Sequence, residues 1–309
     1  MRHLYKGLDS VFIAGCGDIG RRVARLWQIK DKGKAINGSV IGLVRSVESA
    51  AMLNAWHIQP VIADLENTQS ISGQLKLAQS LLYYFAPPSR TGIDDLRMKN
   101  FLAEIEQNNL PAKFIYLSTS GVYGDQQGRL IDETVIPNPK EDRAIRRYAA
   151  ECAVRDWGMM VNVPVVILRV GGIYGPGRLP VKRLLDRVPV IHENLAPSTN
   201  RIHADDLAQA CVAAAIYGEA GGIYNITDGC HSNMTEYFNQ IADFVGLPRP
   251  PAVDWNEAEK VISRGMLSYL RESRRLDNRR MLEELKVKLQ YPDLQAGLQT
   301  CLAEKINNK

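Results

Sequence analysis

A glycine-rich turn lies between a short apolar segment and an amphipathic helical pattern near the start of the chain. The apolar segment covers residues 11–14, and a helix is expected over residues 19–29. The turn between them reads Gly15-Cys16-Gly17-Asp18-Ile19-Gly20. In this setting the first glycine permits a tight turn, the second admits a pyrophosphate, and the third allows close helix–strand packing. The helix N-terminus attracts the anion. A dinucleotide site formed by these six residues is therefore predicted, with a purely structural turn as the alternative.

Short apolar segments alternate with helical patterns through the first two-thirds of the chain. Strands are expected over residues 11–14, 40–44, 61–63, 81–85, 114–118, 165–170 and 223–226. Helices are expected over residues 19–29, 47–56, 94–106, 142–157 and 206–217. Several strand segments are apolar almost throughout, as strands covered on both faces must be. The pattern predicts an α/β fold, in which a doubly wound parallel sheet carries helices on both faces.

After residue 233 the pattern changes to helices joined by loops, and arginine becomes dense. Five arginines fall within ten positions: Arg271, Arg274, Arg275, Arg279 and Arg280. We predict a dinucleotide-binding domain of residues 1–170 and 198–232, and a smaller, mostly helical substrate lobe of residues 171–197 and 233–309. The arginines form either a solvated helical face or, for one or two of them, a phosphate contact in the cleft between the lobes.

Composition excludes several classes of protein. With 45% hydrophobic and 23% charged residues the chain is globular, and its net charge of +4 is too small to indicate nucleic-acid binding. No uncharged apolar run is long enough to span a membrane. The segment 13–16 resembles a lipoprotein cleavage box, but the apolar stretch before the cysteine is too short for a signal peptide. Five cysteines, without paired spacing to histidines, argue against disulfides and a metal site and favour a cytoplasmic protein.

The end of the second expected strand distinguishes between nicotinamide cofactors. An NAD-selective site usually has an acidic residue there, which holds the ribose 2′-hydroxyl. This chain has Arg45 followed by Ser46 instead. A guanidinium can hold a 2′-phosphate through paired charge-assisted hydrogen bonds, so NADP is the predicted cofactor and NAD the second choice. The alternative is a solvated Arg45 and an unselective site.

Two further pairs of residues follow the third and fourth expected strands. Asp64 and Leu65 are expected beside the adenine, and Ala86 and Pro87 at the nicotinamide side of the cleft. Both positions follow the rule that ligands of open α/β sheets bind beyond the carboxyl ends of the strands.

Ordered motifs extend through nearly the whole chain. They are Leu117-Ser118-Thr119-Ser120-Gly121-Val122-Tyr123-Gly124, Asp132-Glu133-Thr134, Leu168-Arg169, Ile173-Tyr174-Gly175-Pro176-Gly177-Arg178, Arg201-Ile202-His203-Ala204-Asp205-Asp206-Leu207 and Tyr224-Asn225-Ile226-Thr227-Asp228. In these motifs the chain resembles the extended short-chain dehydrogenases/reductases, specifically the NAD-dependent epimerase/dehydratase group, which acts largely on nucleotide sugars. The resemblance implies a Rossmann fold. It also implies a possible homodimer through the helices at 94–106 and 142–157, where Tyr148 and Trp157 suit either a dimer contact or the core.

The chain departs from this family at two motifs. Its glycines are spaced GxGxxG, whereas extended members usually have GxxGxxG, and no Tyr-x-x-x-Lys occurs anywhere. Counting back from Glu151, which resembles the family's acidic residue, places Arg147 at the lysine position and Arg143 at the tyrosine position. The chain is similar in this respect to atypical members of the family.

The missing tyrosine changes the expected chemistry, because that hydroxyl exchanges the substrate proton and arginine offers no base. The resemblance places Thr119 at the reacting substrate oxygen and Ser118 beside the cofactor. Arg143 and Arg147 would orient an anionic substrate or stabilise an oxyanion. Their i,i+4 spacing puts them on one helix face with Glu151, which is either functional or a solvated, salt-bridged face. The buried stripe is expected to be Ile145, Tyr148, Ala149 and Cys152.

Further residues are assigned on the resemblance and on arginine density. The expected substrate contacts are Tyr123, Arg178, Arg201 and Arg275. The remaining candidate proton carriers are Tyr123, Asp125, His192 and His203. The sequence thus predicts an NADP(H)-dependent atypical oxidoreductase or epimerase-like protein for a small anionic substrate, with nucleotide sugars as the implied class. The alternative is a non-catalytic NAD(P)-binding sensor or partner-binding protein.

Overall fold

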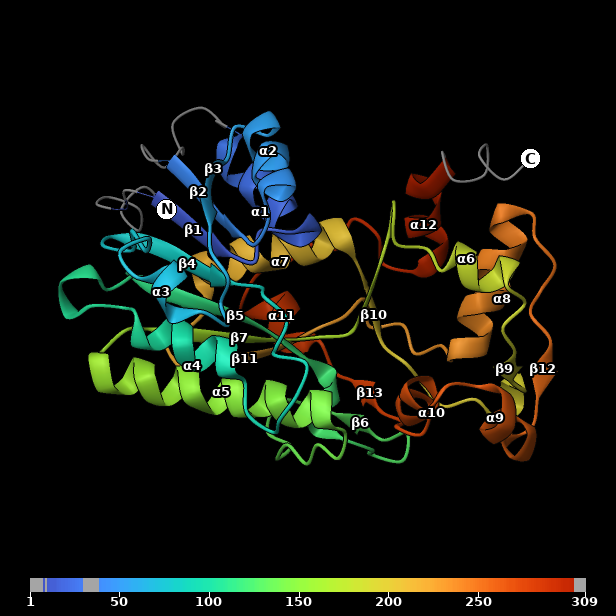
Figure 1. Ribbon diagram of the computed structural model, residues 1–309. Coiled ribbons are helices and arrows are strands. Elements are labelled where there is room, and N and C mark those ends of the chain that lie inside the picture. Colours follow the sequence, from blue (N-terminus) through green and yellow to red (C-terminus); the bar gives the residue numbers. More distant parts are fainter. Residues whose placement is uncertain (1–7, 9, 30–38, 303–309) are drawn as a thin grey trace.

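A seven-stranded parallel sheet forms the centre of the computed structural model, which describes residues 8, 10–29 and 39–302 (Figure 1). In spatial order the strands are β3 (Gln59–Ile62), β2 (Ser39–Val44), β1 (Ser10–Ala14), β4 (Ser80–Tyr84), β5 (Lys113–Thr119), β7 (Val165–Val170) and β11 (Ile223–Ile226). The strand order reverses between β1 and β4, as in doubly wound dinucleotide-binding folds. The predicted parallel α/β sheet is confirmed. Only the third strand is displaced, since it begins at Gln59 and carries Pro60, which an edge strand tolerates.

Helices cover both faces of this sheet. One face carries α1 (Asp18–Gln28), α2 (Val47–Ala55) and α7 (Ala204–Tyr217), and the other carries α3 (Thr68–Ile71), α4 (Leu96–Ala103) and α5 (Asp142–Val161). Side chains alternate between the two cores along each strand. In β1, Val11 and Ile13 belong to the core under α1 and α7, whereas Phe12 and Ala14 belong to the core under α4 and α5. Burial on both faces explains why the strand segments are apolar throughout.

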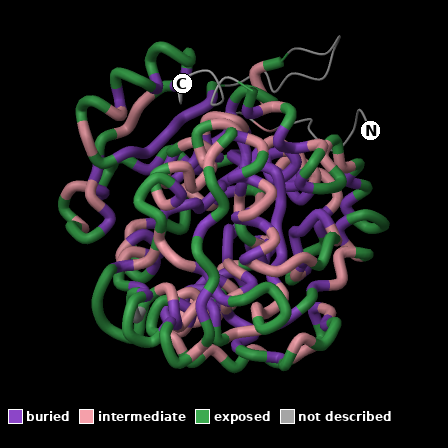
Figure 2. The backbone as a smooth tube through the Cα atoms, turned by 90° about the vertical axis from the view of Figure 1, so that its right-hand side faces the viewer, coloured by how far each residue is buried: buried purple, intermediate pink, exposed green. Residues whose placement is uncertain are grey.

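The smaller, mostly helical part of the molecule lies beyond the carboxyl ends of β5 and β7. Its elements are β8 (Gly172–Tyr174), α6 (Val181–Leu185), β9 (Val190–Ile191), β10 (Arg201–His203), α8 (Met234–Val245), β12 (Ala252–Val253), α9 (Trp255–Val261), α10 (Arg264–Leu270) and α12 (Leu294–Leu298). Two separate hydrophobic clusters hold it together, one around α6, α8 and α12 and one around α9 and α10. Figure 2 shows buried backbone gathered in the interior, with exposed segments around it.

The segment between α10 and α12 returns to the large sheet. There β13 (Arg275–Leu276) pairs with β6 (Leu130–Ile131), and α11 (Arg279–Glu283) packs against β11. Met281, Leu285 and Val287 are part of the large-sheet core, whereas the sequence pattern predicts residues 233–309 as part of the smaller lobe. The exact domain boundaries stay a prediction, and residues 1–7, 9, 30–38 and 303–309 of the predicted domains lie outside the described residues. Within the described ranges, no helix is long and apolar enough to cross a membrane.

Candidate functional site

A cavity of about 310 Å³ opens at the carboxyl ends of β1 to β4. We call it the glycine-loop cavity. Six predicted cofactor-binding residues line it: Gly15, Arg45, Asp64, Leu65, Ala86 and Pro87. It lies where the strand order reverses, which is the expected ligand site of such sheets.

The three glycines of the turn are required for different structural reasons. Gly15 has φ +81°, and a Cβ there would lie 2.5 Å from the backbone nitrogen of Ala86. A Cβ on Gly20 would lie 3.1 Å from Sγ of Cys16, so this glycine allows α1 to pack closely. A Cβ on Gly17, the N-cap of α1, would meet nothing within 4 Å, so the space above it is open to a ligand. Cys16 and Ile19 are buried beneath the turn.

Arg45 is exposed at the edge of the glycine-loop cavity, with no ion pair to any carboxylate of the described residues. Ser46 does not line the cavity, and its Oγ caps α2 by accepting the N–H of Ser49 at 3.3 Å. Sequence reasoning missed Arg90 and Arg97, which also line the cavity and follow the fourth strand. The cavity is therefore rich in cations, as a site for an anionic ligand requires.

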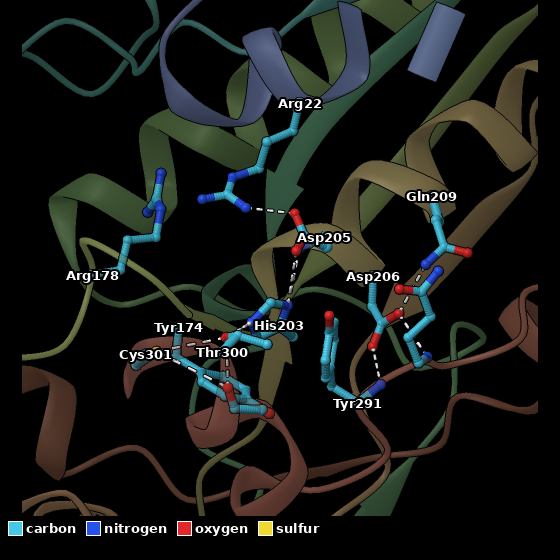
Figure 3. A network of polar contacts seen from close by, with 12 residues as sticks. Arg22, Tyr174, Arg178, His203, Asp205, Asp206, Gln209, Tyr291, Thr300 and Cys301 are labelled. Carbon is cyan, nitrogen blue, oxygen red and sulfur yellow. Dashed lines mark hydrogen bonds and ion pairs between the residues drawn. The ribbon is translucent and has the colours of Figure 1, made fainter. Parts of the chain in front are cut away.

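Asp18 begins a chain of ion pairs at the start of α1. Its carboxylate lies 3.0 Å from Arg22 and 2.6 Å from Arg178. Arg22 in turn reaches Asp205 in the first turn of α7 (Figure 3). Burial opposes ionisation of Asp18, but the two arginines outweigh it and hold the pKa of Asp18 below its usual value. Arg178, which was predicted to contact the substrate, lies beside the glycine turn in this structure.

A second cavity, of about 320 Å³, lies beyond the ends of β5 and β7. We call it the Thr119 cavity. Its walls are Pro88, Thr119, Ser120, Gly121, Arg143, Ala144, Arg147, Val170, Gly171, Gly172, Tyr269, Glu272 and Arg274. The structure thus brings together the three predicted catalytic residues, Thr119, Arg143 and Arg147. Pro88 lines both cavities, so the two are neighbours.

Arg147 binds neutral acceptors at the ends of the central strands. Its Nη1 donates to the carbonyl oxygens of Ala86 at 3.2 Å and Leu117 at 3.1 Å, and to the hydroxyl of Tyr116 at 3.3 Å. No carboxylate of the described chain lies within 4 Å of it. A half-buried guanidinium without an ion-pair partner is costly, which favours an anion in this cavity.

The face of α5 that carries the arginines is turned inward. Its fully buried residues include Ala150, Glu151, Val154 and Trp157, and Trp157 packs on Phe114 in the core. The expected buried stripe of Ile145, Tyr148, Ala149 and Cys152 is wrong, because each of these is only half-buried. The helix turns this way because the sheet lies under the Arg147 face.

Arg143 connects α5 to α10 across the mouth of the Thr119 cavity. Its Nη1 donates to the carbonyl oxygen of Gly265 at 3.2 Å and to Oγ of Ser268 at 3.4 Å. Its Cζ lies 5.7 Å from the ring centroid of Tyr269. Arg143 is exposed, but it is not simply solvated.

Three side chains of this cavity that can ionise, Tyr269, Glu272 and Arg274, are among its lining residues that were not predicted as site residues. Nη1 of Arg274 lies 2.8 Å from Oε2 of Glu272 and donates to the carbonyl oxygen of Gly124 at 2.8 Å. Of the arginine cluster, Arg274 lines this cavity. Arg275, the residue predicted as a substrate contact, does not line it: its side chain is exposed, and its Nε donates to the carbonyl oxygen of Gly128.

Ser118 belongs to a buried ionic network and lines neither cavity. Its Oγ lies 2.5 Å from Oε1 of Glu151, whose Oε2 pairs with Arg169 at 2.8 Å. Both charged side chains are only 2% exposed. The cofactor contact expected of Ser118 is not supported, because its hydroxyl is held by this pair.

Two other predicted substrate contacts are buried structural residues. The hydroxyl of Tyr123 donates to Oδ1 of Asn225 at 2.8 Å, and burial raises the pKa of Tyr123 to about 12. Arg201 is 6% exposed and donates to Ser232, Thr199 and the carbonyl oxygen of Asn233. Neither lines the Thr119 cavity.

The other candidate proton carriers also lie away from this cavity. His203 is fully buried, where it caps α7 and contacts Thr300 at 3.0 Å (Figure 3). Burial lowers the pKa of His203 to about 4. Asp125 accepts backbone N–H groups of Gln127 and Ser273, and His192 is exposed.

The sequence matches the model of the NAD dependent epimerase/dehydratase family over residues 12–227. Among curated relatives, the dTDP-D-glucose 4,6-dehydratase of Mus musculus is 31% identical over 141 residues, which are 43% of this chain and 40% of the dehydratase. The chain thus spans about two-fifths of the dehydratases it matches. Protein YeeZ of Escherichia coli K12 is 25% identical over 298 residues, covering 93% of this chain and 97% of that protein.

Solved structures share the fold over almost the whole chain. A functionally unknown conserved protein from Silicibacter pomeroyi is 25% identical, with a TM-score of 0.76 and coverage of 97% of this chain and 99% of that one. The dTDP-glucose 4,6-dehydratase DesIV from Streptomyces venezuelae, solved with NAD and TYD bound, has a TM-score of 0.79. DesIV is 20% identical to this chain, and the match covers 97% of each chain. At this low identity the likeness shows the fold alone.

Proposed function

Because the chain belongs to the NAD dependent epimerase/dehydratase family, we propose that it is an NADP(H)-dependent oxidoreductase or epimerase-like enzyme. Its proposed substrate is a small anionic molecule of the nucleotide-sugar class. One observation carries the proposal: Thr119, Arg143 and Arg147 line one cavity directly beside the glycine-loop cavity. The similarity to dTDP-D-glucose 4,6-dehydratases, enzymes named for a nucleotide sugar, supports this substrate class.

The residues of the glycine-loop cavity fit a dinucleotide. The open space above Gly17 admits a pyrophosphate at the N-terminus of α1, and Arg45 stands where a ribose 2′-phosphate would lie. Asp64 and Leu65 would hold the adenine. A bound nicotinamide supplies or accepts the hydride of the reaction. The similar dehydratase DesIV was solved with NAD bound, so the proposed preference of this chain for NADP rests on Arg45 alone.

The Thr119 cavity supplies a hydroxyl and positive charge. Oγ1 of Thr119 accepts the N–H of Gly121 at 3.2 Å, which leaves its own O–H free to donate to a substrate oxygen. Arg147 stays protonated at any working pH and would stabilise negative charge on that oxygen. Three arginines and one glutamate line the cavity, so it favours an anionic substrate.

The non-catalytic alternative has one observation in its favour. An arginine occupies the position of the usual tyrosine, and arginine cannot exchange the substrate proton. Under this second proposal the protein binds NAD(P) as a sensor or partner-binding subunit.

A paired titration with NADPH and NADH, read by fluorescence and thermal shift, tests the cofactor site. Tighter binding of NADPH is the expected result, and a screen of nucleotide sugars and small carbonyls with that cofactor tests the enzyme. Tight binding without turnover of any substrate supports the sensor. Binding of neither cofactor would overturn the whole proposal.

A further inference from the structure

The Thr119 cavity contains a phenol that comes from the smaller lobe. We propose that Tyr269 on α10 exchanges the substrate proton, in place of the tyrosine that is absent from α5. The inference rests on the proposed function as an enzyme, and it assigns the proton transfer that the two arginines cannot perform.

The hydroxyl of Tyr269 lies over the strand ends that hold Thr119. It is 3.9 Å from the position that a Cβ on Gly172 would occupy. Gly172 lies two residues beyond Val170, and Val170 is the register partner of Thr119 in the β5–β7 pair. Tyr269 and Thr119 both line the same cavity. The two hydroxyl-bearing side chains therefore approach the cavity from opposite lobes.

Tyr269 is half-buried, and its hydroxyl has no hydrogen bond to any residue that the structure describes. By contrast, the hydroxyl groups of five other tyrosines have described protein partners: Tyr83, Tyr116, Tyr123, Tyr174 and Tyr224. A hydroxyl that lines a cavity without a protein partner is free to bind a ligand oxygen.

Arg143 holds α10 in place over the cavity. It donates to Gly265 and Ser268 of the same helix, and its guanidinium lies over the Tyr269 ring. Arg143, at the position of the usual tyrosine on α5, therefore supplies a cation, and Tyr269 on α10 supplies the phenol.

The charged groups around Tyr269 are mostly cations. Arg143 and Arg147 of α5 line the same cavity, together with Glu272 and Arg274 of the loop after α10, and Arg201 of β10 interacts with Tyr269 electrostatically. Glu272 is paired with Arg274 at 2.8 Å. An ionised carboxylate accepts hydrogen bonds but donates none, so Glu272 is a weaker candidate for giving a proton.

The proton transfer balances when it is paired with the hydride that a bound nicotinamide would supply or accept. In the reducing direction the hydride would go to the substrate carbonyl carbon, while the O–H bond of Tyr269 breaks and its proton moves to the carbonyl oxygen, so that the carbonyl becomes a hydroxyl. The resulting phenolate takes a proton from water at the exposed edge of the cavity. In the oxidising direction the phenolate accepts the proton of the substrate hydroxyl.

Steady-state kinetics of Y269F test the proposal. Loss of a positioned general acid should lower kcat about 100-fold or more, with KM and the NADPH dissociation constant nearly unchanged. Y148F is the matched control, since Tyr148 lies on α5 next to Arg147 but lines neither cavity. E272Q tests whether Glu272 transfers the proton in place of Tyr269.

A binding measurement supplies a readout that does not need turnover. The cofactor-free protein is titrated with a nucleoside diphosphate hexose and with the same nucleoside diphosphate without the sugar. Because Tyr269 would bind a sugar oxygen, Y269F should weaken binding of the hexose nucleotide about threefold to tenfold and leave the diphosphate unaffected.

The outcomes separate the inference from the proposed function. A wild-type protein that turns over substrate while Y269F keeps most of its kcat overturns the role of Tyr269 and leaves the enzyme assignment standing. The same holds if E272Q loses activity and Y269F does not, or if both nucleotides bind Y269F as they bind the wild type. A wild-type protein that binds neither NADPH nor NADH overturns the proposed function itself.

Discussion

The Nε atom of Arg178 lies 2.6 Å from Oδ2 of Asp18, and this ion pair ties the loop after β8 to the first turn of α1. Asp18 lies in the first turn of α1, next to the helix N-terminus that would hold a phosphate, and its charge would repel that phosphate if left unneutralised. Arg178 and Arg22 together remove most of this repulsion.

Replacing Arg178 by alanine should therefore weaken NADPH binding about threefold, because the pair is partly exposed and screened by water. The effect should shrink as salt is raised. The double variant D18N/R178A is the control, since it also removes the repelling charge and should bind as the wild type does. Equal losses in the single and double variants would show that Asp18 is not the cause.

Replacing Arg45 by alanine should lower the affinity for NADPH about tenfold or more, because a charge-assisted contact to the 2′-phosphate is lost. NADH lacks that phosphate, so its affinity should stay the same. Titration of both cofactors measures the ratio, and R249A, an exposed arginine after α8, is the control. An unchanged NADPH/NADH ratio in R45A would exclude Arg45 as the selecting residue.

Replacing Arg147 by glutamine should lower kcat/KM about 100-fold, since the cavity loses the cation nearest the ends of β4 and β5. R147K keeps the charge but not the geometry, so it should recover part of the activity. R155Q, two turns further along α5, is the matched control and should be nearly normal. Wild-type kinetics in R147Q would remove Arg147 from the site.

Replacing Glu151 by glutamine should lower the free energy of unfolding by about 3 kcal/mol, because Arg169 is left as a buried, unpaired charge. Urea denaturation measures the loss. E259Q breaks an exposed pair with Arg271 and should cost about 1 kcal/mol or less. Similar losses in the two variants would mean that the buried pair contributes no more than a surface one.

His203 should make stability depend on pH. Its pKa is about 4 in the folded protein and ordinarily 6.5, so only the unfolded chain takes up the proton between these values. The free energy of unfolding should fall by up to about 3 kcal/mol as pH drops from about 6.5 to about 4.

H203N isolates this contribution, because asparagine can still cap α7 but does not titrate. The comparison with H203N is needed because burial raises the pKa of Asp228 to about 7. Protonation of Asp228 in the folded protein makes the free energy of unfolding rise as pH falls over the same pH range, opposite to the effect of His203. Urea denaturation at several pH values should show the wild type losing stability faster than H203N on acidification. Parallel curves would contradict the buried neutral histidine.

Much of the fold could be predicted from local patterns. The strands β1, β2 and β4 and the helix α1 followed from apolar runs, periodicity and the glycine turn, because these signals lie within a few residues of one another. The spacing of Arg143 and Arg147 likewise placed both on one face of α5, and the structure places both at one cavity.

The composition of the site depended on contacts between distant segments. Arg143 reaches Ser268, which is 125 residues further along the chain, so no local pattern could bring Tyr269 to this cavity. Arg274 and Arg275 are adjacent, yet one is buried in the cavity wall and the other is exposed, because successive residues of an extended segment face opposite sides.

The sequence by itself determined the sheet, the glycine turn and the absence of the Tyr-x-x-x-Lys pair, since each is a property of neighbouring residues. The tertiary structure alone decided which polar side chains face the cavities and which are buried in the interior. Tyr123 and Arg201 looked like ligand contacts but satisfy their hydrogen bonds within the protein, because folding brings Asn225 of β11 to Tyr123 and Ser232 to Arg201.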